Sequence, residues 1–251
     1  MKTIGILGGM SWESSIEYER IINTEIRRRL GGVHSADLII RSYDFHEIEA
    51  LQNTGAWDEA GRVLAADAAR LEAAGADVIV LATNTMHKVA RQIEEKLRIP
   101  LLHIADATAE AVKAAGLAAI ALLGTRYTME QDFYRARLTA HGLEVIVPGS
   151  ADRAFIDDVI FGELVQGRIV PESKRRYLEI IDRLFERGAE GVIAGCTEIE
   201  LLVTPDDVDR PYFPTTRIHA IAAVDFALNG PSGSSRVSRT TRGVVVDTND
   251  G

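Results

Sequence analysis

The most constraining feature of this sequence is an internal repeat, in which two segments align at a constant offset. Ala68–Thr85 reads AARLEAAGADVIVLATNT and Ile181–Glu198 reads IDRLFERGAEGVIAGCTE, so the two segments lie 113 residues apart. Each contains an Arg-Leu pair, then Gly-Ala and an acidic residue, then a short apolar run. At this offset Thr83 aligns with Cys196. Self-similarity of this kind predicts two halves of similar design.

The apolar pattern around these segments alternates between two lengths. Short runs rich in Ile, Val and Leu are typical of strands that are buried on both faces of a sheet. Longer segments, Trp57–Ala74 and Ser173–Arg187, place their apolar residues at helical spacing. Strands that alternate with helices predict parallel sheets and an α/β fold. The expected strands are Thr3–Leu7, Asp37–Ser42, Asp77–Leu81, Ala119–Leu123, Glu144–Val147 and Gly191–Ala194.

We therefore expect two pseudo-symmetric three-layer α/β/α domains with mostly parallel sheets and an active site in the cleft between them. A domain boundary is expected around Pro100, which interrupts a helical pattern. The first domain is predicted to comprise residues 1–98 and 210–228, and the second domain residues 99–209. Residues 229–251 are rich in Gly, Ser, Thr and Arg and have no helical face, so they are predicted to be a disordered tail.

The composition narrows the partners and the location that we expect. The 37 acidic residues outnumber the 28 Lys and Arg, and the formal net charge is −9. Because an acidic chain repels phosphate backbones, no nucleic-acid partner is expected. No apolar run approaches the roughly 20 residues that a membrane helix needs, so no membrane association is expected. The single cysteine excludes an intrachain disulfide and favours a reducing, cytoplasmic setting.

Two side chains able to carry protons follow strands that are equivalent in the repeat. Thr83 and Cys196 each come just past a predicted strand, and ligands of parallel sheets bind at that edge. Asn84 and Thr197 come next and are expected to begin helices whose free backbone N–H groups suit a carboxylate. If the halves face each other, two acid–base groups meet across one cleft, as inversion of a stereocentre by proton transfer requires. Taken singly, Cys196 fits a small buried apolar residue and Thr83 a helix cap, but the repeat favours the chemical interpretation.

Four short motifs resemble those of the aspartate/glutamate racemase superfamily. They are GGMSWES at Gly8–Ser14, ATNTMHK at Ala82–Lys88, LLGTRYTM at Leu122–Met129 and GCTEI at Gly195–Ile199. The resemblance covers the chain up to the predicted tail, and it implies a cofactor-independent, two-domain amino-acid racemase that is usually a homodimer. Members of the superfamily carry a cysteine after the corresponding strand of each half, whereas here the first is replaced by Thr83.

The resemblance also implies how the substrate is held. Asn84, Thr85 and Thr197 are expected to bind its α-carboxylate through side chains and backbone N–H groups, and Thr125 is expected to assist from the second half. Glu198 is expected to lie near the substrate ammonium. Without the resemblance, Asn84 and Thr197 would fit helix caps, and Glu198 would fit a first-turn residue that favours the helix dipole.

The groups that contact the substrate side chain are less constrained. Met10 is expected to present its backbone to the cleft after a Gly-Gly turn. Gln52 and Arg126 are candidates for reaching a distal carboxylate, whereas Arg168 fits the cleft and a solvated surface equally well. Asp- and Glu-specific relatives normally supply cationic groups there, and a neutral Gln52 suits a broader or uncharged substrate. His87 is expected to be structural.

The expected reaction is racemisation of an acidic or related α-amino acid, with L-Asp and L-Glu favoured. Cys196, as a thiolate, would remove the Cα proton of the L-enantiomer, and Thr83 would protonate the opposite face. The alternatives are a broad-specificity amino-acid racemase, another reaction on the same scaffold (hydantoin racemisation, maleate isomerisation or malonate decarboxylation), and an amino-acid-binding protein with little turnover. The sequence has no dinucleotide fingerprint, P-loop, metal-ligand spacing or marked Schiff-base lysine, so no cofactor and no metal are expected.

Overall fold

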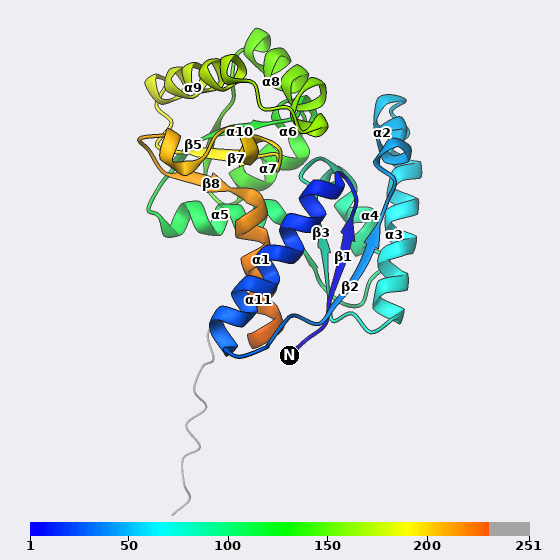
Figure 1. Cartoon of the computed structure of the whole chain (residues 1–251). Helices are drawn as coiled ribbons and strands as arrows, with labels where there is room; N and C mark the ends of the chain where they lie inside the picture. The colour runs from blue at the N-terminus through cyan, green and yellow to red at the C-terminus, as the bar shows by residue number, and fades with distance from the viewer. Residues whose placement is uncertain (231–251) are drawn as a thin grey trace, which may run out of the picture.

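The computed structural model describes residues 1–230 and contains two four-stranded sheets, both parallel (Figure 1). The sheet orders, β2-β1-β3-β4 and β6-β5-β7-β8, repeat one another, so each strand has an equivalent in the other half. This confirms the pseudo-symmetric α/β fold that the repeat predicts. The strands are β1 (Ile4–Gly8), β2 (Leu38–Ser42), β3 (Val78–Leu81) and β4 (Leu101–Leu102), then β5 (Ala119–Gly124), β6 (Glu144–Ile146), β7 (Val192–Gly195) and β8 (Tyr212–Pro214).

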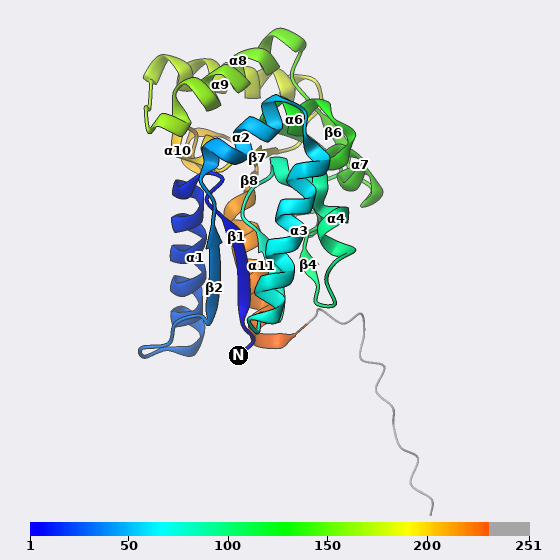
Figure 2. The ribbon, with the colours of Figure 1, turned by 90° about the vertical axis from the view of Figure 1, so that its right-hand side faces the viewer.

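Helices cover both faces of the first sheet, so its central strands β1 and β3 are buried (Figure 2). One face packs against α1 (Trp12–Leu30) and α11 (Thr215–Asn229), and the other packs against α2, α3 and the segment after β3. The helix α11 is apolar on most sides because it lies between the sheet, α1 and α5 of the second half. The other helices are α2 (Phe45–Asn53), α3 (Trp57–Ala73), the 3₁₀ helix η1 (Thr85–Val89) and α4 (Ala90–Glu94).

The second sheet is covered in the same way. One face of this sheet packs against α5 (Ile104–Ala114) and α7 (Asp132–Ala140). The other face packs against α8 (Ser150–Gly162) and α9 (Pro171–Glu186). Both halves are therefore three-layer α/β/α units. No helix within residues 1–230 is long and apolar enough to cross a membrane. Four short elements complete this half: α6 (Arg126–Glu130), η2 (Leu164–Gln166), α10 (Ile199–Leu202) and η3 (Pro205–Asp207).

The boundaries between the halves differ from the expected ones because each sheet has a fourth strand that the sequence pattern did not reveal. The strand β4 lies beyond the expected boundary at residue 98, yet it pairs with β3 of the first sheet. The strand β8 lies within 210–228, which was expected in the first domain, yet it pairs with β7 of the second sheet. Prolines interrupt the apolar runs around both strands, Pro100 before β4 and Pro211 and Pro214 at the ends of β8, so neither run predicts a strand. The helix α11 also extends to Asn229, the first residue of the expected tail, and 231–251 lie outside the described residues.

Two glycines permit the close backbone approaches that shape the carboxyl ends of the sheets. Gly9 follows β1 with φ +81°, and a Cβ atom there would lie 2.3 Å from the backbone of Tyr43. Gly195 ends β7, and a Cβ atom there would lie 2.6 Å from the carbonyl oxygen of Leu123 in β5. The residues that follow these glycines, Met10 and Cys196, consequently enter the space between the two halves.

Candidate active site

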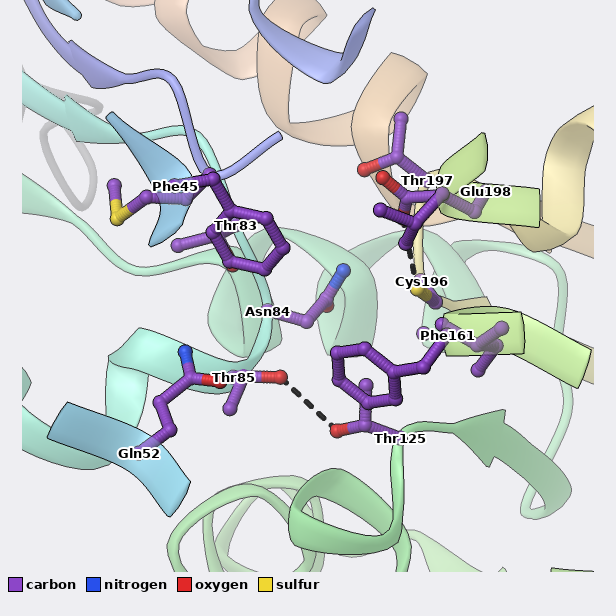
Figure 3. A pocket seen from close by; sticks show the side chains of 14 residues that line it. Phe45, Gln52, Thr83, Asn84, Thr85, Thr125, Phe161, Cys196, Thr197 and Glu198 are labelled. Atoms are coloured by element: carbon purple, nitrogen blue, oxygen red, sulfur yellow. Dashed lines mark hydrogen bonds between the residues drawn. The ribbon is translucent and has the colours of Figure 1, made fainter. Parts of the chain in front are cut away.

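A cavity of about 420 Å³, counting the solvent at its mouth, lies where the carboxyl ends of the two sheets face each other (Figure 3). This is the edge at which parallel sheets bind ligands. Both halves contribute side chains to it, and Figure 3 shows Thr83 and Cys196 on opposite sides with Asn84 between them. All nine residues expected at the site line the cavity: Met10, Gln52, Thr83, Asn84, Thr85, Thr125, Cys196, Thr197 and Glu198.

A buried histidine fixes the backbone of Thr83. Thr83 follows β3, and its carbonyl oxygen accepts a hydrogen bond from Nδ1 of His87 at 2.7 Å. The other ring nitrogen, Nε2, accepts the N–H of Ile104 at 3.2 Å, so the ring carries its proton on Nδ1. Burial and the neighbouring His103 and His219 rings hold the pKa of His87 well below its usual value, which keeps the ring neutral. His87 therefore ties the end of β3 to the start of α5.

The thiol of Cys196 points to a carboxylate rather than to a cation. Its Sγ donates to Oε2 of Glu198 at 2.9 Å, while Oε1 of Glu198 accepts from the hydroxyls of Ser11 at 2.7 Å and Ser14 at 3.3 Å. Burial and the adjacent Glu198 charge raise the pKa of Cys196 well above its usual range, although the backbone N–H groups of Glu198 and Ile199 oppose this. These influences favour the thiol in the ligand-free protein, whereas the reaction expected from the sequence uses the thiolate.

The segment after Cys196 explains why little opposes this rise in pKa. The helix expected to begin at Thr197 is α10, which begins only at Ile199 and has four residues. One helical turn provides too little aligned backbone dipole to offset a carboxylate in direct contact with the sulfur. In the first half, the helix expected at Asn84 is likewise the short 3₁₀ helix η1.

Asn84 lines the cavity, and its amide orientation is fixed by its neighbours. Its Nδ2 donates to the hydroxyl of Thr215 at 3.0 Å, and that hydroxyl donates its only hydrogen to the carbonyl oxygen of Ala194 at 2.8 Å. The Thr215 oxygen can therefore only accept from Asn84, which fixes the orientation of the amide. Oδ1 of Asn84 is buried and has no hydrogen-bond partner within residues 1–230. A buried acceptor without a partner is uncommon in folded proteins.

Hydroxyl groups from the two halves meet on another wall of the cavity. Oγ1 of Thr85, from the first half, lies 3.0 Å from Oγ1 of Thr125, from the second half. Thr125 also caps α6, since its hydroxyl accepts the N–H of Thr128 at 3.4 Å. Thr197 adds a third hydroxyl near Cys196 (Figure 3). These groups form a set of neutral donors that can bind a carboxylate.

Four apolar residues at the cavity were not expected from the sequence. Phe45 comes from the start of α2, Ile160 and Phe161 from the end of α8, and Val165 from η2. We call these four residues the apolar wall. Apolar residues that face a cavity have the same periodicity as those that face the core, so the pattern alone could not separate them.

Comparison with known proteins identifies the family. Residues 7–223 match the sequence model of the family described as Asp/Glu/Hydantoin racemase. The chain belongs to this family. A solved structure of a putative Asp/Glu racemase from Yersinia pestis is 54% identical, with a TM-score of 0.86, and the match covers 91% of this chain and 100% of that one. An aspartate racemase homologue from Pyrococcus horikoshii OT3 is 35% identical, with a TM-score of 0.79 and the same coverage.

A curated relative matches over a shorter stretch. The broad specificity amino-acid racemase RacX of Bacillus subtilis (strain 168) is 26% identical over 149 residues. This alignment covers 58% of the present chain and 63% of RacX, which is less than two thirds of the relative's length.

Among the described residues that line the cavity, Glu198 is the one with an ionisable carboxyl side chain, and none has a cationic side chain. Arg126 lies outside, beside Tyr127 and Asp157, and Arg168 donates to the carbonyl oxygen of Gly162. Neither arginine therefore reaches the cavity. Gln52 does reach it, and its Nε2 contacts the sulfur of Met86 at 3.1 Å. Over residues 1–230, no three His, Cys, Asp or Glu side chains gather in a way that could hold a metal ion.

Proposed function

We propose that this protein racemises free α-amino acids without a cofactor, by proton transfer at Cα between Thr83 and Cys196. The observation that carries the proposal is that these side chains follow equivalent strands, β3 and β7, and line one cavity from opposite halves. Inversion needs one group to remove a proton from one face and another to deliver a proton to the opposite face. The racemase names of the relatives at 54% and 26% identity support the same reaction class.

Substrate binding prepares Cys196 in this proposal. The substrate ammonium lies near Glu198, while its α-carboxylate accepts from the hydroxyls of Thr85, Thr125 and Thr197. Nδ2 of Asn84 already donates to Thr215, and a contact between Asn84 and the α-carboxylate stays a prediction. A bound ammonium partly offsets the charge of Glu198, the carboxylate that helps to raise the pKa of Cys196. Binding therefore favours the thiolate that removes the Cα proton.

The proton leaving Cys196 has an acceptor in contact. Oε2 of Glu198 lies 2.9 Å from the sulfur, within range for direct transfer. The thiolate then takes the Cα proton of the L-enantiomer, and the hydroxyl of Thr83 protonates the other face. The hydroxyl and backbone donors around the α-carboxylate stabilise the enediolate that develops between these two steps.

The charge of the cavity favours substrates with uncharged side chains over the L-Asp and L-Glu first expected. A distal carboxylate would find no cation among the described lining residues, and it would lie near the apolar wall and the carboxylate of Glu198. Burying an unpaired charge is costly, whereas an apolar or amide side chain can use the apolar wall and Gln52. We therefore propose the broad-specificity alternative, with a preference for uncharged α-amino acids. The homodimer and the cytoplasmic location stay predictions.

The test uses two substrate pairs that differ by charge at nearly constant shape. L-Gln with L-Glu, and L-Asn with L-Asp, are incubated with the protein in heavy water, and loss of the Cα proton is followed by NMR. Exchange is expected for all four, with the amide of each pair faster. Faster exchange of both acidic members would restore L-Asp and L-Glu as preferred substrates. Ligand-dependent thermal stabilisation without any exchange would instead identify an amino-acid-binding protein.

A further inference from the structure

Two helices cross from one half of the molecule to the other close to the catalytic strand ends. The helix α5 follows β4 of the first sheet and packs on the second sheet, whereas α11 follows β8 of the second sheet and packs on the first. The helix α11 also contacts α5, and it touches β3 and β4 in one half and β7 and β8 in the other. Its position therefore bears on how far apart the ends of β3 and β7 lie.

The first residue of α11, Thr215, is bonded to both of these strand ends. Its buried hydroxyl donates to the carbonyl oxygen of Ala194 in β7 at 2.8 Å and accepts from Nδ2 of Asn84 at 3.0 Å. Asn84 follows Thr83 directly, and Ala194 lies two residues before Cys196. One hydroxyl group therefore joins the segments that carry the two proton-transfer residues.

The hydroxyl of Thr215 has no part of its own in proton transfer to the substrate. Thr215 is not among the described residues that line the active-site cavity. Its single hydrogen is given to Ala194, and its contact with Asn84 uses an oxygen lone pair. Any effect of Thr215 on the reaction must therefore come through the two groups that it holds.

The first half has a comparable link at the equivalent place. Nδ1 of His87 donates to the carbonyl oxygen of Thr83, and Nε2 of His87 accepts the N–H of Ile104, the first residue of α5. The end of β3 is thus tied to the start of α5, as the end of β7 is tied to the start of α11. The two links differ in reach, because Thr215 contacts a residue from each half.

We propose that Thr215 is a positioning residue, whose hydroxyl sets the spacing between Thr83 and Cys196. It acts by linking Asn84 to the end of β7. The inference rests on the proposed racemisation, in which both groups must face opposite sides of one Cα atom. A displacement of about 1 Å between reacting groups can cost a factor of about 100 in rate. Because other side chains bind the substrate, loss of the link acts on turnover more than on binding.

The first test removes the hydroxyl at nearly constant shape. Thr215→Val is expected to lower kcat and kcat/KM together by about tenfold, with KM within about twofold of wild type, since alignment matters mainly in the transition state. Thr215→Ser keeps the hydroxyl and should recover most of kcat. A rise in KM at unchanged kcat would overturn the proposal, and so would a Thr215→Ser protein that is no more active than Thr215→Val.

The matched control is Thr108→Val on α5. It also removes a buried threonine hydroxyl, which donates to the carbonyl oxygen of Ile104 within the same helix at 2.8 Å. Thr108 is outside the set of described residues that line the cavity, so kcat and KM should both stay at their wild-type values. An equal loss of kcat in Thr108→Val and Thr215→Val would assign the effect to a lost buried hydroxyl in general and overturn the proposal.

The second test asks whether Thr215 acts through Asn84. Asn84→Ala removes the other end of the same link, so in that background Thr215→Val is expected to lower kcat by less than about threefold. Two residues that act independently would instead lose the product of their separate effects. A further loss of about tenfold in the double variant would therefore overturn the link.

The third test needs no turnover, so it distinguishes this inference from the proposed function. Cys196 is the single cysteine and is 8% exposed, so its alkylation by iodoacetamide reports how readily the end of β7 opens. Thr215→Val is expected to raise the alkylation rate several-fold, because Ala194 loses a bond two residues from the sulfur. Thr215→Ser and Thr108→Val should match wild type, and Thr215→Ala replaces Thr215→Val if that protein does not fold.

The outcomes of this test and of the racemase assay separate the two proposals. A lack of Cα exchange by wild type would refute the racemase alone. An alkylation rate that loss of the Thr215 hydroxyl leaves unaltered would refute the link between Thr215 and the end of β7.

Discussion

Replacing Glu198 by Gln tests the protonation of Cys196 most directly. Oε1 of Glu198 accepts from Ser11 and Ser14, while Oε2 accepts from the thiol. In Glu198→Gln, the amide oxygen keeps the two serine hydrogen bonds, so its NH₂ group faces the sulfur. A donor then replaces an anionic acceptor beside Cys196. The thiolate becomes stabilised and the thiol loses its partner, with little change in shape.

The size of the effect follows from the lost interaction. A hydrogen bond to a charged group contributes about 1.5–3 kcal/mol, and about 1.4 kcal/mol corresponds to a factor of ten. The thiolate fraction at neutral pH, and with it the rate of alkylation, should therefore rise about 10- to 100-fold. Racemisation should fall despite the extra thiolate, because the amide cannot take a proton from Cys196.

The assay is iodoacetamide alkylation followed by intact-mass spectrometry, with Cys196→Ala as the unlabelled control. Circular dichroism checks that the Glu198→Gln protein is folded. An alkylation rate equal to or below that of wild type would show that Glu198 does not hold the proton on Cys196. A racemisation rate that rises with the alkylation rate would show that Glu198 accepts no proton during turnover.

Three further outcomes are expected. Cys196→Ala should abolish Cα exchange from L-substrates while circular dichroism stays unchanged, and substantial residual exchange would exclude the thiol as the base. Thr83→Cys should narrow the difference between saturating rates from the L- and D-enantiomers, because a thiol ionises more readily than a hydroxyl; an unchanged ratio would remove Thr83 from the mechanism. Burial lowers the pKa values of His103 and His219 to about 3 and about 4, so the unfolded chain binds more protons than the folded one below pH about 6.5. The free energy of unfolding should therefore decrease as the pH is lowered below about 6.5, by up to about 1.4 kcal/mol for each pH unit and each of the two histidines. Urea titrations that show no such decrease toward pH about 4 would contradict this.

The repeat made much of this architecture predictable. The six expected strands and the helix that begins at Trp57 follow from the apolar runs and apolar spacing of the sequence. The strands β4 and β8 were not predicted because Pro100 and His103 flank β4, and Pro211 and Pro214 bound β8, so neither lies in an uninterrupted apolar run. Their assignment to a sheet depends on pairing with β3 and β7, which is a tertiary property.

The site was predictable in its members and less so in its chemistry. Motifs and the repeat placed Thr83 and Cys196 together, but the protonation of the sulfur depends on which way Glu198 turns. That orientation is set by Ser11 and Ser14, which come from the other half of the molecule. Spacing along the chain carries no information about such a contact. The same limit applies to the apolar wall, whose residues resemble ordinary core residues.

The position of α11 has a consequence for how the protein emerges from the ribosome. This helix is the last element described, yet it covers one face of the sheet formed by β1 to β4 and packs along α1. Buried residues such as Tyr18 and Val80 therefore keep an open apolar face until Thr215–Asn229 has been synthesised. The amino-terminal half cannot complete its core during translation, whereas the second sheet has all its strands by Pro214. Because α11 also packs against α5 of the second half, we expect both halves to complete their packing only when α11 docks, and the nascent first half to need protection from aggregation until then.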